Sequence, residues 1–365
     1  MRITFLLSSL WLSGGVRVII ELSNRLSSKG HSITFIIPGG SVDQDMIDEI
    51  DPLIQVIQTP ISRKKRTTFL NNLRITWSMA KVTPKSDVII STHTPTTPAS
   101  WMAKHIFHRG ELVWFYQDYI EMFYGRPIET WLVRNALKWH KGALVVSKAC
   151  QHELQNFVKG KEIIISGEGL SHMELFHPIS EGERQKDKKG QRTILFLGDM
   201  RPRKGLYDFI KAASIVYQQY PDIFLKIVSK EDCHITCTVP FEYIHRPSRK
   251  QLAGLYTNCD VFVSASWWES FGVPPLEAMA CGSPVVLTDS RGVSDYAEPG
   301  INCLMVKPRD PTALATAIKT ILDQPDLARH LRENGPVTAS HFTWDLAANK
   351  FEKGLVQILD YKGNI

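Results

Sequence analysis

Residues 260–289 constrain the fold of this chain more than any other segment, because they read as strand, loop, short helix and strand. The mostly apolar runs Asp260–Ser266 and Ser283–Asp289 have the length and composition of buried strands. Between them, Pro275–Cys281 is predicted to form a short helix that Gly282 ends, since proline is favoured in a first helical turn and glycine just past the last. Strand, helix and strand make a βαβ unit, which predicts a parallel sheet.

Two glutamates, Glu269 and Glu277, flank the start of this helix with seven residues between them. Glu269 lies beyond the carboxyl end of a strand, where open α/β sheets bind ligands. Glu277 is predicted in the first helical turn, where free N–H groups and the helix dipole attract phosphate. Such a pair suits a sugar nucleotide, since one carboxylate can hold the ribose and the other the sugar. The spacing alone is equally consistent with a solvated Glu269 and an N-terminal helix charge at Glu277.

The alternation of strands and helices extends along the whole chain. One series of strand-like runs ends at Ile163–Ser166, and a second begins at Thr193 after the polar tract Ser180–Gly190. With 365 residues, of which 43% are hydrophobic, the chain is long enough for two domains with a core each. The prediction is an N-terminal Rossmann-like domain over 1–178, a linker over 179–192, a C-terminal Rossmann-like domain over 193–343 and a last helical segment over 344–365.

The first strand, Ile3–Leu7, leads into Gly14-Gly15 and an amphipathic helix predicted at Val16–Lys29. Glycine has no Cβ to keep a ligand away, so this pair can bring backbone N–H groups close to a phosphate or a sugar. A simple turn is the alternative interpretation. No apolar stretch reaches the roughly 20 residues that span a bilayer, so we expect a soluble or peripheral protein.

A basic loop follows the first strand of the second series. It runs from Gly198 through Arg201 to Arg203-Lys204 and opens a helix, so Lys204 and Arg203 can meet phosphate at the carboxyl end of the strand. Cations there would neutralise the negative charge that grows on a departing diphosphate. A solvated basic turn is the alternative.

These segments together resemble glycosyltransferase family 4, the retaining nucleotide-sugar transferases of GT-B fold. The resemblance rests on Glu269–Val286, with matches in order at Ser13–Val16, Gly198–Gly205, Leu252–Tyr256 and Pro299–Asn302, and so covers nearly the whole chain. It implies two Rossmann-like doubly wound domains that face each other across a cleft, with the last helix returning to the first domain. It also implies a hexosyl- or deoxyhexosyltransferase that moves a sugar from a nucleotide diphosphate sugar to a hydroxyl of a glycan, lipid-linked or small-molecule acceptor, in polysaccharide or glycolipid synthesis.

The resemblance also implies roles for individual residues. The expected catalytic residues are Lys204 and Arg203 at the diphosphate, Glu269 at the donor sugar, and Asp118. Glu277 is expected to hold the ribose. The other expected donor-binding residues are Gly14, Gly15, Gly198, Arg201, Arg246, Pro247, Ser270, Phe271, Gly272 and Val273. The family is metal-independent, so neither a metal nor a cofactor is expected.

Two positions depart from the family pattern. Asp199 stands where the family usually has arginine, so either Arg201 or Arg203 supplies the missing guanidinium or donor binding is altered. Gln117 replaces the histidine of a common His-Asp pair, and Asp118 either orients substrate hydroxyls or caps a loop. These departures keep open a non-catalytic subunit that binds sugar nucleotides or glycans. A sugar-nucleotide epimerase on the same scaffold is a second alternative, since fold does not fix function.

The stretch Ile61–Lys85 is basic, amphipathic and free of acidic residues. Such a helix can lie among the headgroups of an anionic membrane, which would fit a lipid-linked acceptor. The residues predicted for this surface are Arg63, Lys64, Lys65, Arg66 and Trp77, and the cluster Trp131–Lys141 could extend it. The alternative is a helix with its apolar face in the core. We expect a cytoplasmic protein, at the inner face of the cell membrane if this stretch binds lipid.

The net charge of +6 suits anionic substrates, but no nucleic-acid motif accompanies it, so a nucleic-acid partner is not expected. The six cysteines are scattered, as expected for core residues in a reducing compartment. Cys233, His234 and Cys237 have no second pair of ligands at zinc-site spacing, so no metal site is expected there. The oligomeric state is not predicted.

Overall fold

The structure is a computed structural model that describes residues 1–62, 68–184, 190–232 and 235–361. It contains two compact units, Met1–Gly169 together with Trp344–Ile365, and Leu170–Thr343. Residues 170–178, predicted in the first domain, thus belong to the second unit, where the Leu170 N–H donates to Phe342 O at 2.9 Å. Within the predicted linker, residues 185–189 lie outside the described residues, and a short 3-10 helix, η4 (Glu181–Glu183), precedes the second sheet.

The first unit is built on a parallel sheet. Its strands are β1 (Arg2–Leu6), β2 (Ser32–Gly39), β3 (Gln55–Ser62), β4 (Val88–Ser91), β5 (Glu111–Tyr116), β6 (Gly142–Val145) and β7 (Glu162–Ile165), in the order β3-β2-β1-β4-β5-β6-β7. The order reverses between β1 and β4. The loops that follow these two strands therefore separate at the carboxyl edge and form the switch point of a doubly wound sheet.

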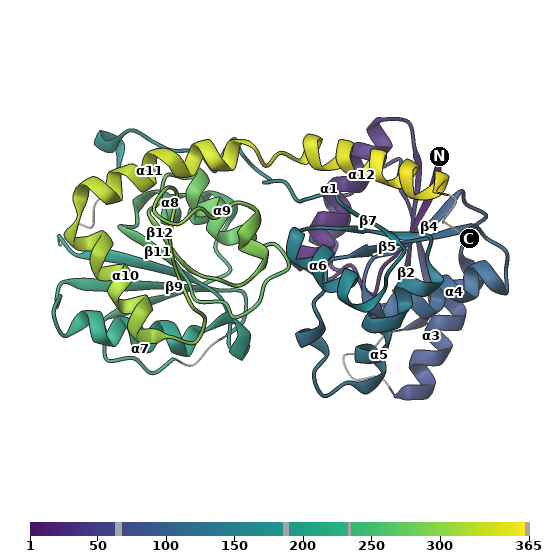
Figure 1. Cartoon of the computed structure of the whole chain (residues 1–365), viewed down its shortest axis with the longest axis horizontal. Coiled ribbons are helices and arrows are strands. Elements are labelled where there is room, and N and C mark those ends of the chain that lie inside the picture. Colours follow the sequence, from purple (N-terminus) through teal and green to yellow (C-terminus); the bar gives the residue numbers. More distant parts are fainter. Residues whose placement is uncertain (63–67, 185–189, 233–234, 362–365) are drawn as a thin grey trace. The chain divides into compact units, whose positions relative to one another are not determined.

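Helices cover both faces of this sheet. They are α1 (Gly14–Ser28), α2 (Gln44–Asp48), α3 (Phe69–Val82), α4 (Thr97–His105), α5 (Pro127–Asn135), α6 (Lys148–Phe157) and α12 (Trp344–Asp360), with 3-10 turns η1 (Thr94–Thr96), η2 (Ile120–Phe123) and η3 (Ala136–Trp139). In Figure 1, α1 and α12 lie on one side of the sheet and α3 and α4 on the other. Ile75 and Met79 of α3 pack there with Ala99 and Ala103 of α4.

The last helix, α12, packs on the first unit although it follows the second in sequence. Phe351 is buried between the rings of Phe5 and Phe115, whose centres lie 6.2 and 5.3 Å away. On the rim, Glu352 pairs with Lys29 at 2.6 Å. Figure 1 shows α12, in yellow, beside the purple α1. A buried apolar stripe with a charged margin thus attaches this helix to the first sheet.

The second unit repeats this plan. Its parallel strands β8 (Arg192–Leu197), β9 (Ile223–Ser229), β10 (Phe241–His245), β11 (Val261–Ser264), β12 (Val285–Thr288) and β13 (Leu304–Val306) lie in the order β10-β9-β8-β11-β12-β13. The helices are α7 (Leu206–Tyr217), α8 (Arg249–Asn258), α9 (Val273–Ala280), α10 (Pro311–Asp323) and α11 (Pro325–Ser340), with turns η5 (Pro202–Lys204) and η6 (Gly292–Asp295). The order reverses between β8 and β11. Two Rossmann-like doubly wound units are thereby confirmed. None of the helices within the described residues is both long and apolar enough to cross a membrane.

Candidate active site

The two loops at the switch point of the second sheet carry a charged cluster. Lys204, at the end of η5, places Nζ 2.6 Å from Glu269 Oε1, in the loop after β11. Arg203 Nη1 lies 3.5 Å from Glu269 Oε2. Ser266 Oγ donates to Glu269 Oε1 at 2.8 Å. The structure thus brings together two predicted cations and the predicted carboxylate, as expected for neighbouring strands whose carboxyl ends meet at one edge.

The surroundings of Glu269 keep it ionised. Burial by itself raises the pKa of this carboxyl group, but the charges of Lys204 and Arg203 and the hydrogen bonds from Lys204 and Ser266 outweigh it, so the pKa is lowered. A diphosphate that reached Lys204 would share this cation with Glu269. The cluster can therefore hold phosphate and a sugar hydroxyl side by side.

Backbone contacts fix the position of the Glu269 loop. The Glu269 N–H donates to Ser290 O at 3.0 Å, and the Gly292 N–H donates to Glu269 O at 3.2 Å. A Cβ on Gly292 would lie 2.5 Å from Glu269 O, so only glycine fits there. The predicted donor-binding run continues into α9 through Ser270, Phe271, Gly272 and Val273, where Gly272 adopts a φ of 89° and the Phe271 ring is buried.

The helix that carries Glu277 begins earlier than predicted. α9 starts at Val273 and not at Pro275, because a first turn needs no N–H donors and so accepts both prolines. The prediction of Glu277 in the first turn is therefore wrong. Its Oε2 accepts from Tyr256 Oη at 3.1 Å, and its Oε1 lies 3.8 Å from Arg249 Nη1, both partners coming from α8.

Asp199, where the family pattern has arginine, is paired with its neighbour. Arg201 binds it through Nε to Oδ1 at 2.8 Å and through Nη2 to Oδ2 at 2.5 Å. Burial raises the pKa of Asp199, but the hydrogen bonds and charge of Arg201 outweigh it and the pKa is lowered. Arg201 is thus engaged by Asp199. Of the two candidate arginines, Arg203 is the one that contacts Glu269.

Gly198, Arg246 and Pro247 lie at the same carboxyl edge. A Cβ on Gly198 would lie 2.6 Å from the Phe196 ring, so glycine is required here to leave room for that side chain. Arg246 follows β10 with a φ of 46°, and its Nε donates to Lys230 O at 2.9 Å. Pro247 then leads into α8. Their contact with a nucleotide remains a prediction.

Two tryptophans that directly precede Glu269 form a contact that the motifs did not predict. The guanidinium of Arg309, after β13, lies 3.9 Å from the centre of the Trp267 ring and 5.0 Å from that of Trp268. Trp267 Nε1 donates to Asp208 Oδ2 at 2.7 Å. Arg309 has a φ of 62°, which costs about 1 kcal/mol for a residue other than glycine. The cation–π contact offsets this strain, and Arg309 thereby stabilises the loop that carries Glu269.

In the first unit, Gly14 and Gly15 form the first turn of α1. The helix begins at Gly14 and not at Val16, with Ser13 as its N-cap, accepting from the Val16 N–H at 3.3 Å. A Cβ on Gly14 would meet open space, whereas one on Gly15 would lie 3.1 Å from Gln117 Oε1. First-turn N–H groups have no acceptor within their own helix, so this position fits the predicted ligand contact.

Asp118 is buried, and both of its oxygens accept hydrogen bonds. His93 Nδ1 lies 2.5 Å from Oδ1, while the N–H and the hydroxyl of Thr94 donate to Oδ2 at 2.8 and 2.7 Å. The prediction did not include His93. Asp118 was expected from the resemblance, but a feature that the two residues share could have found His93, because each is a polar residue just past a buried strand, β4 for His93 and β5 for Asp118.

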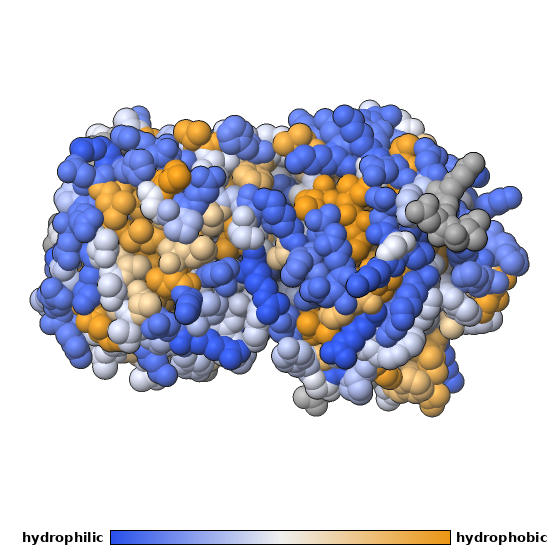
Figure 2. Space-filling model, in the orientation of Figure 1, coloured by the Kyte–Doolittle hydropathy of each residue, from blue (hydrophilic) through white to orange (hydrophobic). Residues whose placement is uncertain are grey.

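The predicted membrane surface is partly described. Arg63, Lys64, Lys65 and Arg66 lie outside the described residues. Trp77 of α3 is 47% exposed and packs against Phe107, with ring centres 5.3 Å apart. The apolar side chains of α3 divide into two groups, since Ile75 and Met79 are buried but others are exposed. The exposed ones are Phe69, Leu70, Leu73 and Trp77, and Figure 2 shows apolar surface over α3.

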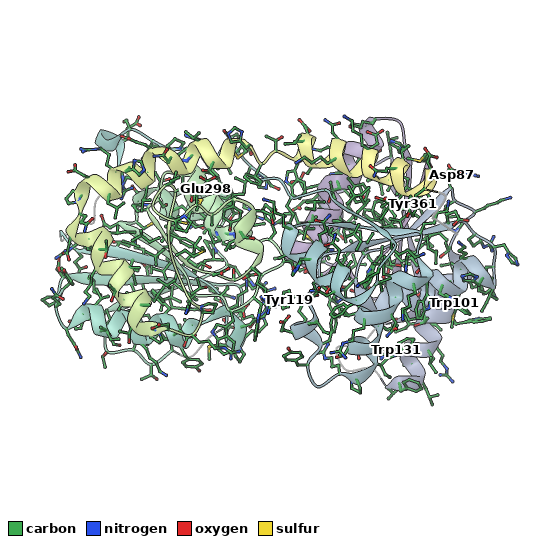
Figure 3. The ribbon with its side chains drawn as sticks, viewed as in Figure 1. Asp87, Trp101, Tyr119, Trp131, Glu298 and Tyr361 are labelled. Carbon is green, nitrogen blue, oxygen red and sulfur yellow. The ribbon has the colours of Figure 1, made fainter. Side chains whose placement is uncertain are left out.

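The second aromatic cluster is also at the surface. Trp131 on α5, labelled in Figure 3, is 54% exposed. It borders a hollow of about 400 Å³ lined by Gly125, Arg126, Pro127, Thr130, Trp131 and Arg134. Two guanidinium groups and an indole thus lie around one depression of the first unit.

The cysteines of the described residues are free thiols. Burial raises the pKa of Cys259 to about 11 and that of Cys303 to about 12, as expected for inert core residues. Within the described residues, no three His, Cys, Asp or Glu side chains are grouped to hold a metal. Cys233 and His234 lie outside those residues.

Family models match both units. The model described as Glycosyltransferase Family 4 matches residues 12–165, and the model described as Glycosyl transferases group 1 matches residues 179–338. The D-inositol 3-phosphate glycosyltransferase of Paenarthrobacter aurescens (strain TC1) is 31% identical over 172 residues, which are 42% of this chain and 41% of that protein. The match thus spans less than half the length of this relative.

Solved structures show the same fold. Sucrose-phosphate synthase from Thermosynechococcus elongatus superposes with a TM-score of 0.82 at 19% identity, over 98% of this chain and 99% of that chain. Anabaena Alr3699/HepE in complex with UDP-glucose superposes with a TM-score of 0.79 at 17% identity, over 98% and 100%. Two Rossmann-like doubly wound units make up the GT-B fold of glycosyltransferases. Since both family models match, the chain belongs to glycosyltransferase family 4, as the sequence motifs indicated.

Proposed function

We propose that this glycosyltransferase moves a sugar from a nucleotide diphosphate sugar to an acceptor hydroxyl with retention of configuration, in polysaccharide or glycolipid synthesis. The observation that carries the proposal is the cluster of Lys204, Arg203 and Glu269 at the switch point of the second sheet. Anabaena Alr3699/HepE has been solved in complex with UDP-glucose and with UDP, which makes a uridine nucleotide the first donor to test.

The cluster suits such a transfer because its charges oppose the charge of the leaving group. As the bond between the anomeric carbon and the diphosphate breaks, negative charge grows on the phosphate oxygen, where Lys204 and Arg203 stabilise it. Glu269 accepts a hydrogen bond from a sugar hydroxyl. The acceptor oxygen bonds to the anomeric carbon on the same face, and its proton goes to the departing phosphate oxygen.

The direct test is nucleotide release from a panel of UDP-, GDP-, ADP- and dTDP-sugars without added metal. Release with one donor, lost in Lys204→Met, would support the transferase and identify the donor. Tight binding without release, even with lipid and glycan acceptors present, would favour a non-catalytic binding subunit. Inversion at the anomeric carbon, read by NMR of the product, would contradict retention.

We further propose a lipid-linked acceptor reached from the inner face of the cell membrane. The exposed apolar side chains of α3 support this proposal, together with the basic residues that precede them in sequence. Co-flotation with phosphatidylglycerol vesicles, and not with phosphatidylcholine vesicles, is the expected result. Equal flotation of a Phe69→Ser/Leu70→Ser variant would contradict a role for α3.

Asp199 provides a test of the charge at the donor site. We expect Asp199→Asn to bind UDP about threefold to tenfold more tightly, because it removes a negative charge beside the phosphate site while its amide oxygen can still accept from Arg201. Calorimetric titration measures this change. Asp222→Asn is the matched control, since Asp222 binds Arg192 with the same two-bond geometry at the amino end of β8. Weaker UDP binding in Asp199→Asn would show that Asp199 contributes favourably to UDP binding.

Arg309 provides a test of whether the cation–π contact stabilises the Glu269 loop. We expect Arg309→Gly to lower turnover about fivefold to tenfold, because the Glu269 loop loses its cation–π contact. Stability should change by less than about 1 kcal/mol, since glycine relieves the strain at this φ. The near-UV circular dichroism of the tryptophan pair should weaken. Arg329→Ala, at an exposed position of α11, is the control. An unaltered spectrum with full activity would rule out a stabilising role of Arg309 for this loop.

A further inference from the structure

The switch point of the first sheet holds a histidine of fixed orientation. The chain leaves β4 through Thr92 and His93, and His93 Nδ1 lies 2.5 Å from Asp118 Oδ1. An ionised carboxylate can only accept hydrogen bonds, so Nδ1 carries a proton, and in the neutral imidazole Nε2 then carries the lone pair. A carboxylate that sets the tautomer of an imidazole in this way leaves the other nitrogen ready for a substrate.

Asp118 is well held for this role. It is 3% exposed, and Thr94 donates both its N–H and its hydroxyl to Oδ2. Burial raises the pKa of Asp118, but its interaction with His93 and the hydrogen bonds from His93 and Thr94 outweigh it, so the pKa is lowered and the carboxylate stays ionised. The His93 side chain keeps 29% exposure, and the described residues offer no hydrogen-bond partner to its Nε2.

The groups around His93 suit a hydroxyl more than a phosphate. Thr92, Thr94 and Gln117 are neutral, and the carboxylate of Asp118 would repel an anion. Gln117, which stands where the family pattern has histidine, donates to Thr92 O at 3.1 Å. The imidazole at this edge of the sheet is that of His93, in the loop after β4. The cations paired with Glu269 belong to the second unit. The diphosphate therefore goes to the second unit, and a neutral hydroxyl fits the first.

We infer that His93 is a catalytic residue that accepts, at Nε2, the hydrogen bond of the attacking acceptor hydroxyl, and that Asp118 is the residue that positions it. This inference rests on the proposed transferase function. The bond made is still that between the acceptor oxygen and the anomeric carbon, the bond broken is that to the diphosphate, and the proton ends on the diphosphate. His93 fixes the orientation of the hydroxyl through this hydrogen bond.

The test separates transfer to an acceptor from reactions that need the donor alone. With octyl glycosides as acceptors, His93→Ala should lower transfer about 100-fold, whereas UDP affinity and donor hydrolysis should stay within about twofold of wild type. His93→Gln, whose amide oxygen can accept in place of Nε2, should recover about tenfold of this loss. His152→Ala, at an exposed position of α6, is the matched control and should be neutral.

Asp118→Asn tests the tautomer itself. The Thr94 N–H requires an acceptor, so the asparagine oxygen must face Thr94 and its NH2 group must face His93. Nδ1 then accepts, the proton moves to Nε2, and transfer should fall as far as in His93→Ala, with no further loss in the double variant. ¹⁵N NMR of labelled histidine should show Nε2 unprotonated in the wild type and protonated in Asp118→Asn.

The possible outcomes distinguish the inference about His93 from the proposed transferase function. A wild-type His93 protonated on Nε2 would overturn the inference, whatever the activity. Full acceptor transfer by His93→Ala would overturn it too, but would leave the transferase function standing. A wild-type protein that turns over no donor would overturn both.

Discussion

Glu269→Gln is expected to lower sugar transfer about 1000-fold while leaving the fold intact. The amide keeps the size of the side chain and can still accept from Ser266 and Lys204, but it lacks the carboxylate charge that we propose holds the donor sugar. Removal of one preorganised polar group from such a site typically costs about 100-fold to 1000-fold in turnover. The measurement is UDP release in the presence and absence of acceptor.

The same variant should bind UDP at least as tightly as the wild type. In the structure, Lys204 and Arg203 are paired with Glu269, so removal of its negative charge strengthens the attraction of both cations for phosphate. A fall in turnover without weaker ground-state binding is the signature of an interaction that acts in the transition state. A loss of UDP affinity would instead show that Glu269 mainly organises the two cations.

Glu352→Gln is the matched control. Glu352 also binds a lysine at 2.6 Å, namely Lys29, and has His31 as a second partner, but it lies on α12 of the first unit. Its loss should leave turnover unaltered. If Glu269→Gln keeps more than about a tenth of wild-type activity, the proposed catalytic role of Glu269 is wrong.

The lowered pKa of Glu269 adds a prediction about stability and pH. Its folded pKa lies below the unfolded value of about 4.5, so its ion pairs stabilise the fold above that value and lose this effect as pH falls through the folded pKa. The difference in unfolding free energy between wild type and Glu269→Gln should therefore shrink from about pH 6 towards about pH 3. Urea denaturation at a series of pH values measures it. A difference independent of pH would contradict the ionised pair.

Gly205→Ala is expected to destabilise the protein by about 3 kcal/mol or more and to abolish transfer. Gly205 has a φ of 67°, and a Cβ there would lie 2.0 Å from Ala265 O. Both the left-handed backbone and the collision with the main chain oppose any side chain. Because Gly205 directly follows Lys204, relief of the collision must move the loop that presents the two cations. Urea denaturation and UDP release measure the two effects.

Gly254→Ala is the control for Gly205→Ala. Gly254 lies within α8, and a Cβ there would meet no atom within 4 Å. Alanine should therefore stabilise the helix by about 0.5 to 1 kcal/mol. Equal effects of the two substitutions on stability would contradict the close approach of Gly205 to Ala265.

Much of the fold could be predicted because buried strands and helices leave a local pattern of apolar residues in the sequence. The strand predicted at Ile3–Leu7 is β1, Arg2–Leu6, since a continuous apolar run before turn residues has few other interpretations. The helix starts were less accurate. α1 and α9 each begin two residues earlier than predicted, because glycine and proline are tolerated in a first turn, where the N–H groups have no helical partner.

The sequence by itself determined the alternation of strands and helices, the parallel sheets and the loops that would carry Lys204 and Glu269, because these follow from side-chain period and from residues within one turn of each other. Only the tertiary structure decided which side chains meet. Lys204 contacts Glu269, His93 contacts Asp118 and Arg309 stacks on Trp267 across long stretches of chain. Such contacts depend on strand order and on how adjacent loops pack, which no local pattern encodes.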